Sequence, residues 1–485
     1  MKTITVLVFM LSLLVTAGAQ PNPDTLWTHT FGGSGYDWAY SIQQTSDGGF
    51  IVAGVTGSFG AGGHDFYLVK TNSLGDTLWT RTYGGTNDDW AYFIQQTSDG
   101  GYIVAGYTHS RGAGLADFYL VKTNSQGDTL WTRTYGGTDN DYAYSVQRTS
   151  DGGYIVAGWT DSFGAGRSDV YLVKTNSQGD TLWTRTYGGS ASDGAWSVRQ
   201  TADGGYVLAG TTFSFGAGNY DLYLVKTNSL GDTVWTRTYG GGSRDEALFV
   251  LQTTDRGYIV AGYAESFGAG LYDFYLVKTD SLGDTLWTRT YGGSSWEYGY
   301  SVQQTTDAGY IIAGYTYSLS AASNDLYLVK TNSQGGLLWT RTFGGNTWDE
   351  AQSVQQTSDG GYIMAGYTES FGAGSRDFYL VKTGPDQLDS EPICLSAPSQ
   401  YMLYPNFPNP FNPSTRISYA LPKAAHVRLT VFNLLGEQIA TLADGIQPTG
   451  IHTLSFDGSA LASGVYLYLL QSEGFSQARK MVLLK

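Results

Sequence analysis

A 52-residue repeat, present in seven copies, constrains this chain more than any other feature. The tripeptide Phe/Tyr-Gly-Gly recurs every 52 residues without one insertion or deletion, and the copies span residues 24–383. A fixed period of this length is typical of solenoids and propellers, in which each repeat buries its apolar faces against its neighbours. The tripeptide begins at Phe31, Tyr83, Tyr135, Tyr187, Tyr239, Tyr291 and Phe343.

Each copy contains four short runs with the composition of strands, rich in β-branched and aromatic residues and bounded by Gly, Asp, Asn and Ser. In the second copy these runs cover residues 78–83, 91–97, 102–107 and 117–122. Residues 98–101 and 124–128 connect strands with the Asp and Gly chemistry of tight hairpins. A four-stranded antiparallel unit repeated seven times predicts an all-β fold, a seven-bladed β-propeller, with a β-solenoid as the alternative.

The points in the repeat at which the array begins and ends predict how such a ring closes. The chain begins the array with a lone strand candidate, residues 26–31, and leaves it after residues 378–382. The last blade therefore has only three strands of its own. We expect the N-terminal strand to supply the fourth and close the ring, because this removes an open sheet edge.

Two resemblances concern the repeats. The signatures DGGY-V-AG and D-YLVK resemble the propeller repeats of secreted bacterial proteins. Residues 75–79, Gly-Asp-Thr-Leu-Trp, are more weakly similar to the Trp-docking segment of quinoprotein propellers. The cofactor site of that family does not carry over, because its Cys pair is absent and Cys394 is the only cysteine here. We expect no cofactor.

Seven internal copies separate scaffold positions from candidate site positions. Residues identical in every copy are interpreted as architecture, whereas two stretches vary: the loop after Gly-Gly and the loop after the third strand. Alternate connections of a meander emerge at the same edge of a sheet. Both variable loops are therefore expected on one face of the propeller, which is the predicted binding face, and both invariant hairpins on the other.

Tryptophan usage favours the same face. Of 13 Trp, seven belong to the invariant series, and the other six lie in or next to the variable loops. Aromatic rings mixed with carboxylates, Asn and Arg suit stacking on sugars or contact with a protein partner. The alternative, that these rings pack between blades beneath the loops, stays open. The predicted binding residues are Trp38, Trp90, Tyr142, Trp159, Trp296, Trp348, His109 and Arg111.

Catalysis and metal binding find little support. Asp at turns and strand entrances accepts backbone hydrogen bonds, and no calcium-loop motif appears, so no metal site is predicted. No G-x-S-x-G elbow or H-E-x-x-H motif occurs, so no catalytic residue is predicted. Paired acids such as Asp88 and Asp89 would suit a glycosidase, yet acids occur at this place in every copy. That acidic series is Asp37, Asp89, Asp141, Asp193, Asp245, Glu297 and Asp349.

The N-terminus and the net charge restrict the compartment and the partners. Lys2, the apolar run 6–15 and the small residues 17–19 predict a signal peptide over residues 1–19. No other segment could cross a bilayer, so the mature chain is expected to lack a transmembrane segment. The formal charge of −15 repels phosphate backbones, which argues against nucleic-acid binding.

A different module follows the repeats. Residues 384–403 have the composition of a polar linker, and residues 404–485 predict a small antiparallel sandwich. The motifs PNPFNPST, VFNLLGEQIATL, FDGSALASGVYLY and KMVLLK in this module closely resemble the type A sorting domain of type IX secretion cargo. The resemblance implies recognition of residues 404–485 by the outer-membrane translocon, proteolytic removal of the domain, and release or anchoring at the surface of a Gram-negative bacterium.

Together these features favour a secreted or cell-surface binding protein whose variable face contacts a glycan or a protein. A secreted hydrolase acting on polysaccharide and a structural surface component are the alternatives.

Overall fold

The computed structural model of the chain describes residues 23–320, 323–386, 401–403, 406, 411 and 413–483. The chain divides into two compact units, residues 1–388 and 389–485. The predicted signal peptide, Cys394 and most of the predicted linker lie outside the described residues. In the described part of the chain, no helix is long and apolar enough to span a membrane.

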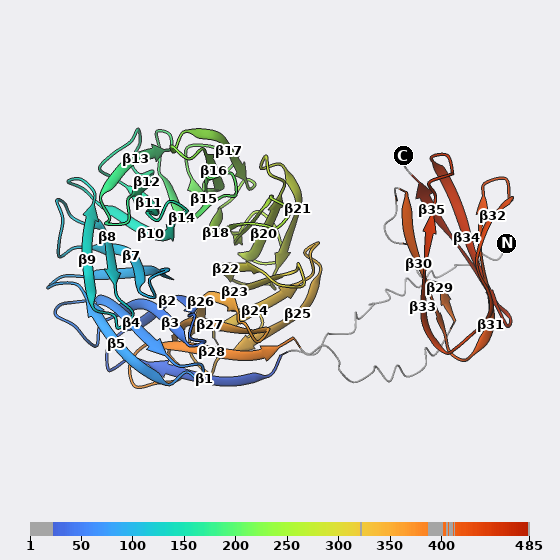
Figure 1. The fold of residues 1–485 in the computed structure, drawn as a ribbon, viewed down its shortest axis with the longest axis horizontal. Helices are drawn as coiled ribbons and strands as arrows, with labels where there is room; N and C mark the ends of the chain where they lie inside the picture. The colour runs from blue at the N-terminus through green and yellow to red at the C-terminus, as the bar shows by residue number, and fades with distance from the viewer. Residues whose placement is uncertain are drawn as a thin grey trace, which may run out of the picture. The chain divides into compact units, whose positions relative to one another are not determined.

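Seven four-stranded antiparallel sheets make up the first unit and surround a central axis, so this unit is the predicted seven-bladed β-propeller (Figure 1). The innermost strands are β2 (Asp37–Gln44), β6 (Asp89–Gln96), β10 (Asp141–Arg148), β14 (Asp193–Gln200), β18 (Asp245–Gln252), β22 (Glu297–Gln304) and β26 (Asp349–Gln356). The second strands are β3 (Phe50–Thr56), β7 (Tyr102–Thr108), β11 (Tyr154–Thr160), β15 (Tyr206–Thr212), β19 (Tyr258–Ala264), β23 (Tyr310–Thr316) and β27 (Gly361–Thr368).

The third and outermost positions of each sheet, counted from the axis, are also occupied by equivalent strands. The third strands are β4 (Asp65–Thr71), β8 (Asp117–Thr123), β12 (Asp169–Thr175), β16 (Asp221–Thr227), β20 (Asp273–Thr279), β24 (Asp325–Thr331) and β28 (Asp377–Pro385). The outermost strands are β5 (Thr77–Tyr83), β9 (Thr129–Tyr135), β13 (Thr181–Tyr187), β17 (Thr233–Tyr239), β21 (Thr285–Tyr291), β25 (Leu337–Phe343) and β1 (Thr25–Phe31).

The N-terminal strand lies in the sheet of the last repeat, whose strand order is β1-β28-β27-β26. Trp27 lies opposite Lys382 in an antiparallel register, and the backbone N–H of Gly384 donates to the carbonyl of Asp24 at 2.8 Å. Figure 1 shows the blue β1 beside the orange β28. Since β28 extends to Pro385, residues 384 and 385, which the sequence analysis assigns to the linker, belong to this last sheet.

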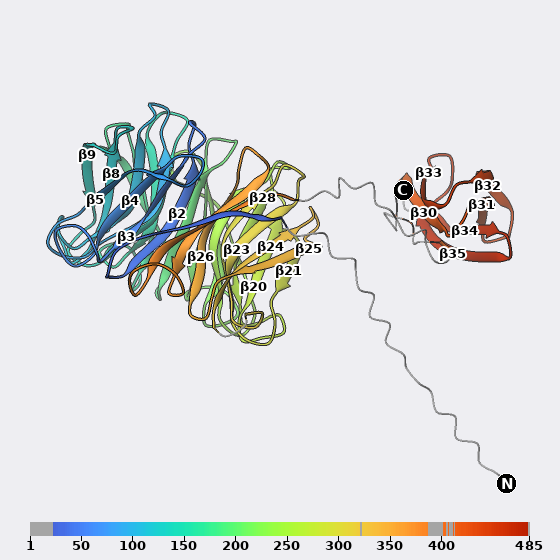
Figure 2. The same ribbon diagram turned by 90° about the horizontal axis from the view of Figure 1, so that it is seen from below.

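Each pair of neighbouring sheets shares a hydrophobic core. Phe66 and Leu68 of the first sheet pack with Tyr102 and Val104 of the second, and all four are buried. The core between the last sheet and the first has nearly the same composition, with Phe378 and Leu380 beside Phe50 and Val52. The side view in Figure 2 shows β2 of the first sheet beside β26 of the last. The second and third strands are therefore buried along almost their whole length, because both of their faces are covered.

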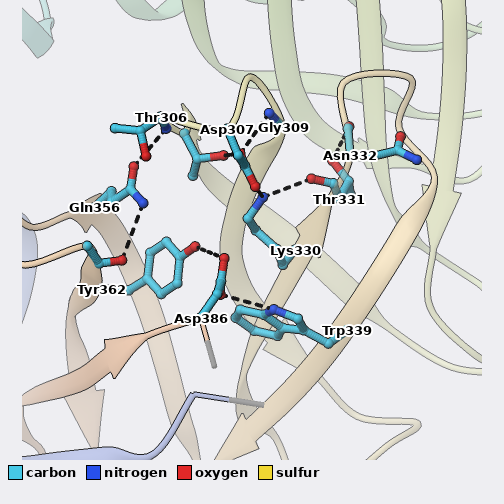
Figure 3. Close-up of polar contacts among 12 residues, drawn as sticks. Thr306, Asp307, Gly309, Lys330, Thr331, Asn332, Trp339, Gln356, Tyr362 and Asp386 are labelled. Atoms are coloured by element: carbon cyan, nitrogen blue, oxygen red, sulfur yellow. Dashed lines mark hydrogen bonds and ion pairs between the residues drawn. The ribbon is translucent and has the colours of Figure 1, made fainter. Parts of the chain in front are cut away.

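A Lys–Asp ion pair at each invariant hairpin explains the repeated Asp and Lys residues (Figure 3). The buried Lys330 Nζ donates to Asp307 Oδ2 at 2.7 Å and to the carbonyl of Thr331 at 3.0 Å. Asp307 Oδ1 in turn accepts the backbone N–H of Gly309 at 2.9 Å. The same ion pair occurs in every repeat, so this Asp series has the structural role expected for it.

The second unit consists of two packed sheets. The smaller has the order β29-β30-β33 and the larger β32-β31-β34-β35. Their inner faces form one core that includes Val431, Tyr468 and Leu470. The strands are β29 (Met402–Leu403), β30 (Ser414–Leu421), β31 (Ala425–Asn433), β32 (Gln438–Gln447), β33 (Gly450–Asp457), β34 (Gly464–Ser472) and β35 (Phe475–Leu483).

Candidate functional site: an aromatic pocket on the propeller axis

A β-bulge in every innermost strand builds the candidate site. In β2, Ala39 pairs with Gly54 and Ser41 pairs with Ala53, so Tyr40 is the extra residue between them. The same shift occurs at the same place in the other six innermost strands. Bulges re-aim a side chain and are common beside functional sites. The bulged residues are Tyr40, Tyr92, Tyr144, Trp196, Leu248, Tyr300 and Gln352.

The bulge explains why one position of the second strand is always glycine. A Cβ on Gly54 would lie 1.9 Å from the carbonyl oxygen of Trp38, and the equivalent glycines meet equivalent carbonyls. Because backbone approaches this closely only where no side chain intervenes, the bulge and the glycine require each other. The Ala-Gly pair in the repeat signature therefore marks the place where the innermost strand bends toward the axis.

The bulged residues surround an axial cavity of about 480 Å³. Of the 20 residues that line it, 11 are aromatic. The ring centroids of Tyr40 and Tyr92 are 4.7 Å apart, and those of Tyr144 and Trp196 are 4.3 Å apart. Among the described residues, the indole Nε1 groups of Trp38 and Trp196 are buried donors without an acceptor. The cavity wall is thus rich in aromatic ring faces.

Two carboxyl groups and two guanidinium groups complete the wall. Glu246 and Glu350 occupy equivalent positions in repeats 5 and 7, and both are buried. Glu246 is paired with Arg244, while Arg376 Nε donates to Glu369 Oε1 at 2.7 Å. Aromatic–polar walls of this kind are typical of small-molecule sites, in which a few polar groups fix the orientation of the ligand.

Burial dominates the electrostatics of the cavity. It raises the pKa of Glu350 to about 7, although hydrogen bonds from Tyr367 and Asn324 and the charge of Arg376 act in the opposite direction. Burial also raises the pKa of Tyr40 and of Tyr300 well above the usual value for tyrosine. Glu350 is consequently a carboxyl group that exchanges its proton near neutral pH.

The variable loops lie together at the end of the axis where this cavity is found. The backbone N–H of Asp37 donates to the carbonyl of Arg376 at 2.9 Å, and that of Gly57 donates to the carbonyl of Tyr36 at 2.7 Å. These bonds join a loop that follows Gly-Gly to loops that follow β3 and β27, which are second strands of their sheets and the third strand run of each repeat in the sequence. Both classes of variable loop therefore share one face, as expected, and Arg244 and Arg376 reach the cavity from them.

The structure separates the predicted binding residues into groups. Trp38 lines the cavity and meets Trp90 edge-on at a centroid distance of 5.4 Å. Tyr142 and Trp159 pack together with 4.5 Å between their ring centroids, and neither residue lines the cavity. His109 is half-buried beside them, and its Nδ1 contacts the carbonyl of Leu115 at 2.7 Å.

The remaining predicted residues are exposed on the loop face. Trp296 and Trp348 are each 45% exposed, and Arg111 is exposed as well. The two interpretations of the loop tryptophans, exposed rings and rings packed beneath the loops, therefore each apply to part of the set. Trp38, Trp90, Trp159 and Trp196 are half-buried. A binding role for these residues stays a prediction.

Most residues of the cavity wall lie outside the predicted set, because they stand in strands and the predicted set belongs to the variable loops and their edges. The signal lay in the innermost strand, where one position reads Tyr, Tyr, Tyr, Trp, Leu, Tyr and Gln in the seven copies. A position that varies between otherwise identical strands is a candidate for contact with a ligand. The neighbouring position carries the two further departures, Phe93 and Phe249, where the other copies have Ser.

The acidic series beside the variable loops has a local structural role. Asp89 Oδ2 accepts the backbone N–H of Gly85 and the hydroxyl of Ser110, both at 2.8 Å. In the part of the chain that the structure describes, no three His, Cys, Asp or Glu side chains are grouped so as to hold a metal ion.

Comparisons with known proteins bear on both units. The chain is 24% identical over 261 residues to the regulatory protein FlaEY of Caulobacter vibrioides, a match that covers 48% of this chain and 27% of that protein. This chain therefore spans about a quarter of the relative's length.

Solved structures with some similarity include three proteins. PorZ, a surface component of the type IX secretion system of Porphyromonas gingivalis, has a TM-score of 0.40 and 12% identity, over 94% of this chain and 60% of that chain. A fungal alcohol oxidase of the AA5 family has a TM-score of 0.45 and 11% identity, over 95% and 99%. A quinoprotein alcohol dehydrogenase-like protein of Bacteroides thetaiotaomicron has a TM-score of 0.38 and 13% identity, over 64% and 67%.

The clearest match concerns the second unit. Residues 406–484 match the family of secretion system C-terminal sorting domains. This agrees with the motifs in its sequence and with its separate folding unit. The chain therefore carries a type IX secretion sorting domain, which directs it to the cell surface or the extracellular space of a Gram-negative bacterium.

Proposed function

We propose that this protein is a surface or extracellular binding protein whose propeller takes a carbohydrate into the axial cavity. The observation that carries the proposal is a cavity of about 480 Å³ that combines aromatic faces with two buried carboxyl groups and two guanidinium groups. Sugars present apolar ring faces for stacking and hydroxyl groups for hydrogen bonds, and this wall offers partners for both. Export by the type IX route would expose the cavity to extracellular polysaccharide.

A screen of the purified protein against a glycan array, followed by calorimetric titration of each hit, tests this proposal. The seven repeats supply substitutions that the fold already tolerates. Tyr92→Leu introduces the residue that repeat 5 has at this position, and Tyr300→Gln introduces that of repeat 7. Loss of one stacking ring is expected to weaken binding roughly five- to tenfold, because such contacts contribute about 1 kcal/mol.

Trp296→Ala and Phe163→Ala are the matched controls, since both rings are exposed on the loop face and neither lines the cavity. These variants should bind as the wild-type protein does. If they abolish binding while the Tyr variants retain it, the ligand occupies the loops and the axial site is excluded. If no glycan binds, the proposal fails.

Glycoside hydrolysis is a second candidate, favoured by one observation. Glu350 has a pKa raised to about 7 by burial, as a general acid requires, and Glu246 shares the same cavity. Release of reducing sugar from a bound polysaccharide, abolished in Glu350→Gln with binding retained, would identify the hydrolase. Binding without release supports the binding protein.

A further inference from the structure

The propeller axis contains a second cavity beyond the aromatic one. Phe93 and Phe249 line both cavities, and the guanidinium group of Arg199 lies between their rings, 4.8 Å and 4.7 Å from the two centroids. This layer separates the aromatic cavity from one of about 210 Å³ at the hairpin end. Arg199 is the only charged side chain among the described residues that line the smaller cavity.

Arg199 is a buried cation with no counter-ion in the described part of the chain. The residue is 9% exposed, its Nη1 donates to the carbonyl of Val198 at 2.7 Å and to Ser145 Oγ at 3.3 Å, and no carboxylate among the described residues pairs with it. Burial lowers the pKa of this guanidinium group to about 10. Buried charges are costly unless they are paired, so this arrangement stabilises any anion that reaches it.

Five glutamines arrange further donors around the same cavity. The Oε1 of each accepts a backbone N–H of the next repeat, as in the bond from Gln44 N to Gln355 Oε1 at 2.6 Å. Because this bond fixes the amide oxygen, the other end of the amide, the Nε2 donor, is left without an acceptor among the described residues. The five are Gln43, Gln95, Gln147, Gln303 and Gln355.

We propose that the narrow cavity binds one small oxyanion, held by the free nitrogen atoms of Arg199 and by the Nε2 groups of the surrounding glutamines. Guanidinium groups bind sulfate, phosphate and carboxylate groups through paired N–H bonds, and amide donors complete such a site. The lining contains no acidic group to repel the anion, although the chain as a whole carries a charge of −15. The site is independent of any carbohydrate in the aromatic cavity.

Thermal unfolding of the full-length protein in sodium sulfate, phosphate or acetate at constant ionic strength tests the site. We expect a saturable rise in Tm with at least one of these anions, because a ligand that binds only the folded state stabilises it. Arg199→Gln introduces the residue found at this position in five repeats, and should lose the saturable rise. Gln303→Leu, which copies Leu251 of repeat 5, should weaken it severalfold while the charge remains.

Arg185→Gln is the control, because Arg185 is an exposed arginine whose guanidinium lies over Trp183. Sulfate also stabilises proteins by exclusion from their surface, and this effect appears equally in every variant. Anion-dependent stabilisation that is the same in the wild-type protein and in Arg199→Gln would overturn the proposal. Isothermal titration of the wild-type protein with the most stabilising anion should give one site per chain.

Discussion

At the scale of single residues, function is built from departures from the repeat. Glu350 and Glu246 stand where the first three repeats have aromatic residues, and Arg199 stands where five repeats have Gln. Each departure places a charged side chain at one of seven equivalent positions that otherwise hold mostly apolar or neutral side chains. A repeat scaffold can carry such costs, because its stability is approximately a sum over similar repeats and the interfaces between them.

The carboxyl group of Glu350 gives a pH dependence that can be measured. Its pKa rises from the ordinary 4.5 to about 7 in the folded protein. The folded state therefore holds this proton more tightly, so Glu350 costs no stability below its unfolded pKa. The cost grows as the pH rises from about 4.5 to about 7 and is constant above the folded pKa. The full cost is on the order of 3 kcal/mol. Denaturant unfolding should show Glu350→Gln gaining this much over the wild-type protein between pH 4 and pH 8, an interval of about four pH units that brackets both pKa values.

The control for this prediction is Glu246→Gln. Glu246 occupies the equivalent position in repeat 5 but is ion-paired with Arg244, so its removal leaves a guanidinium group unpaired. This variant should lose stability at neutral pH and keep the pH trend that Glu350 causes. A difference between Glu350→Gln and the wild-type protein that does not change with pH would contradict the assignment.

At the scale of elements, the invariant hairpins invite a comparison between copies. Five of the turns that join an innermost strand to its neighbour have Gly in the left-handed region, such as Gly204 with φ of 82°. Arg256 and Ala308 occupy the same position with φ of 67° and 64°. Arg256→Gly and Ala308→Gly should each stabilise the propeller by roughly 0.5–1 kcal/mol, because L-residues are strained in this region.

Denaturant midpoints measure the effect, and the same turns provide two checks. Gly204→Ala should destabilise by a similar amount, since no atom lies within 4 Å of the added Cβ and the cost is conformational. Ala202→Gly, in the same turn but outside the left-handed region, should give no gain. Equal effects at positions 202 and 308 would show that the backbone conformation is not the cause.

The same elements show how far sequence reasoning reaches. Strands, hairpins and the shared face of the variable loops follow from alternation, turn chemistry and the 52-residue period, and the structure contains all of them. The axial cavity did not follow, because it depends on a bulge at Tyr40 and its equivalents, and a one-residue insertion leaves little trace in a strand pattern. The six loop tryptophans were visible, but their depth in the protein was not.

At the scale of the whole molecule, the last sheet of the propeller packs against the first. The interface between the last and first sheets uses the bonds found elsewhere in the ring: the N–H of Ser358 donates to Gln44 Oε1 at 2.8 Å, as that of Ser46 donates to Gln96 Oε1 at 2.9 Å. The β1 strand then covers the outer edge of β28. Every sheet of the propeller thereby has four strands, and the seventh has no more exposed edge than the others.

Deletion of residues 23–31 tests the contribution of this strand. The β28 edge would lose its partner, so we expect a lower Tm and concentration-dependent association, both measurable by calorimetry and light scattering. A synthetic peptide of residues 23–33 should restore the monomer and the Tm, because it can add back to the free edge by main-chain hydrogen bonds. Removal of the sorting unit, residues 401–485, should leave the Tm of the propeller unchanged, because that unit is separately compact. A truncated propeller that keeps the wild-type Tm and ignores the peptide would show that the pairing of Trp27 with Lys382 contributes nothing to the ring.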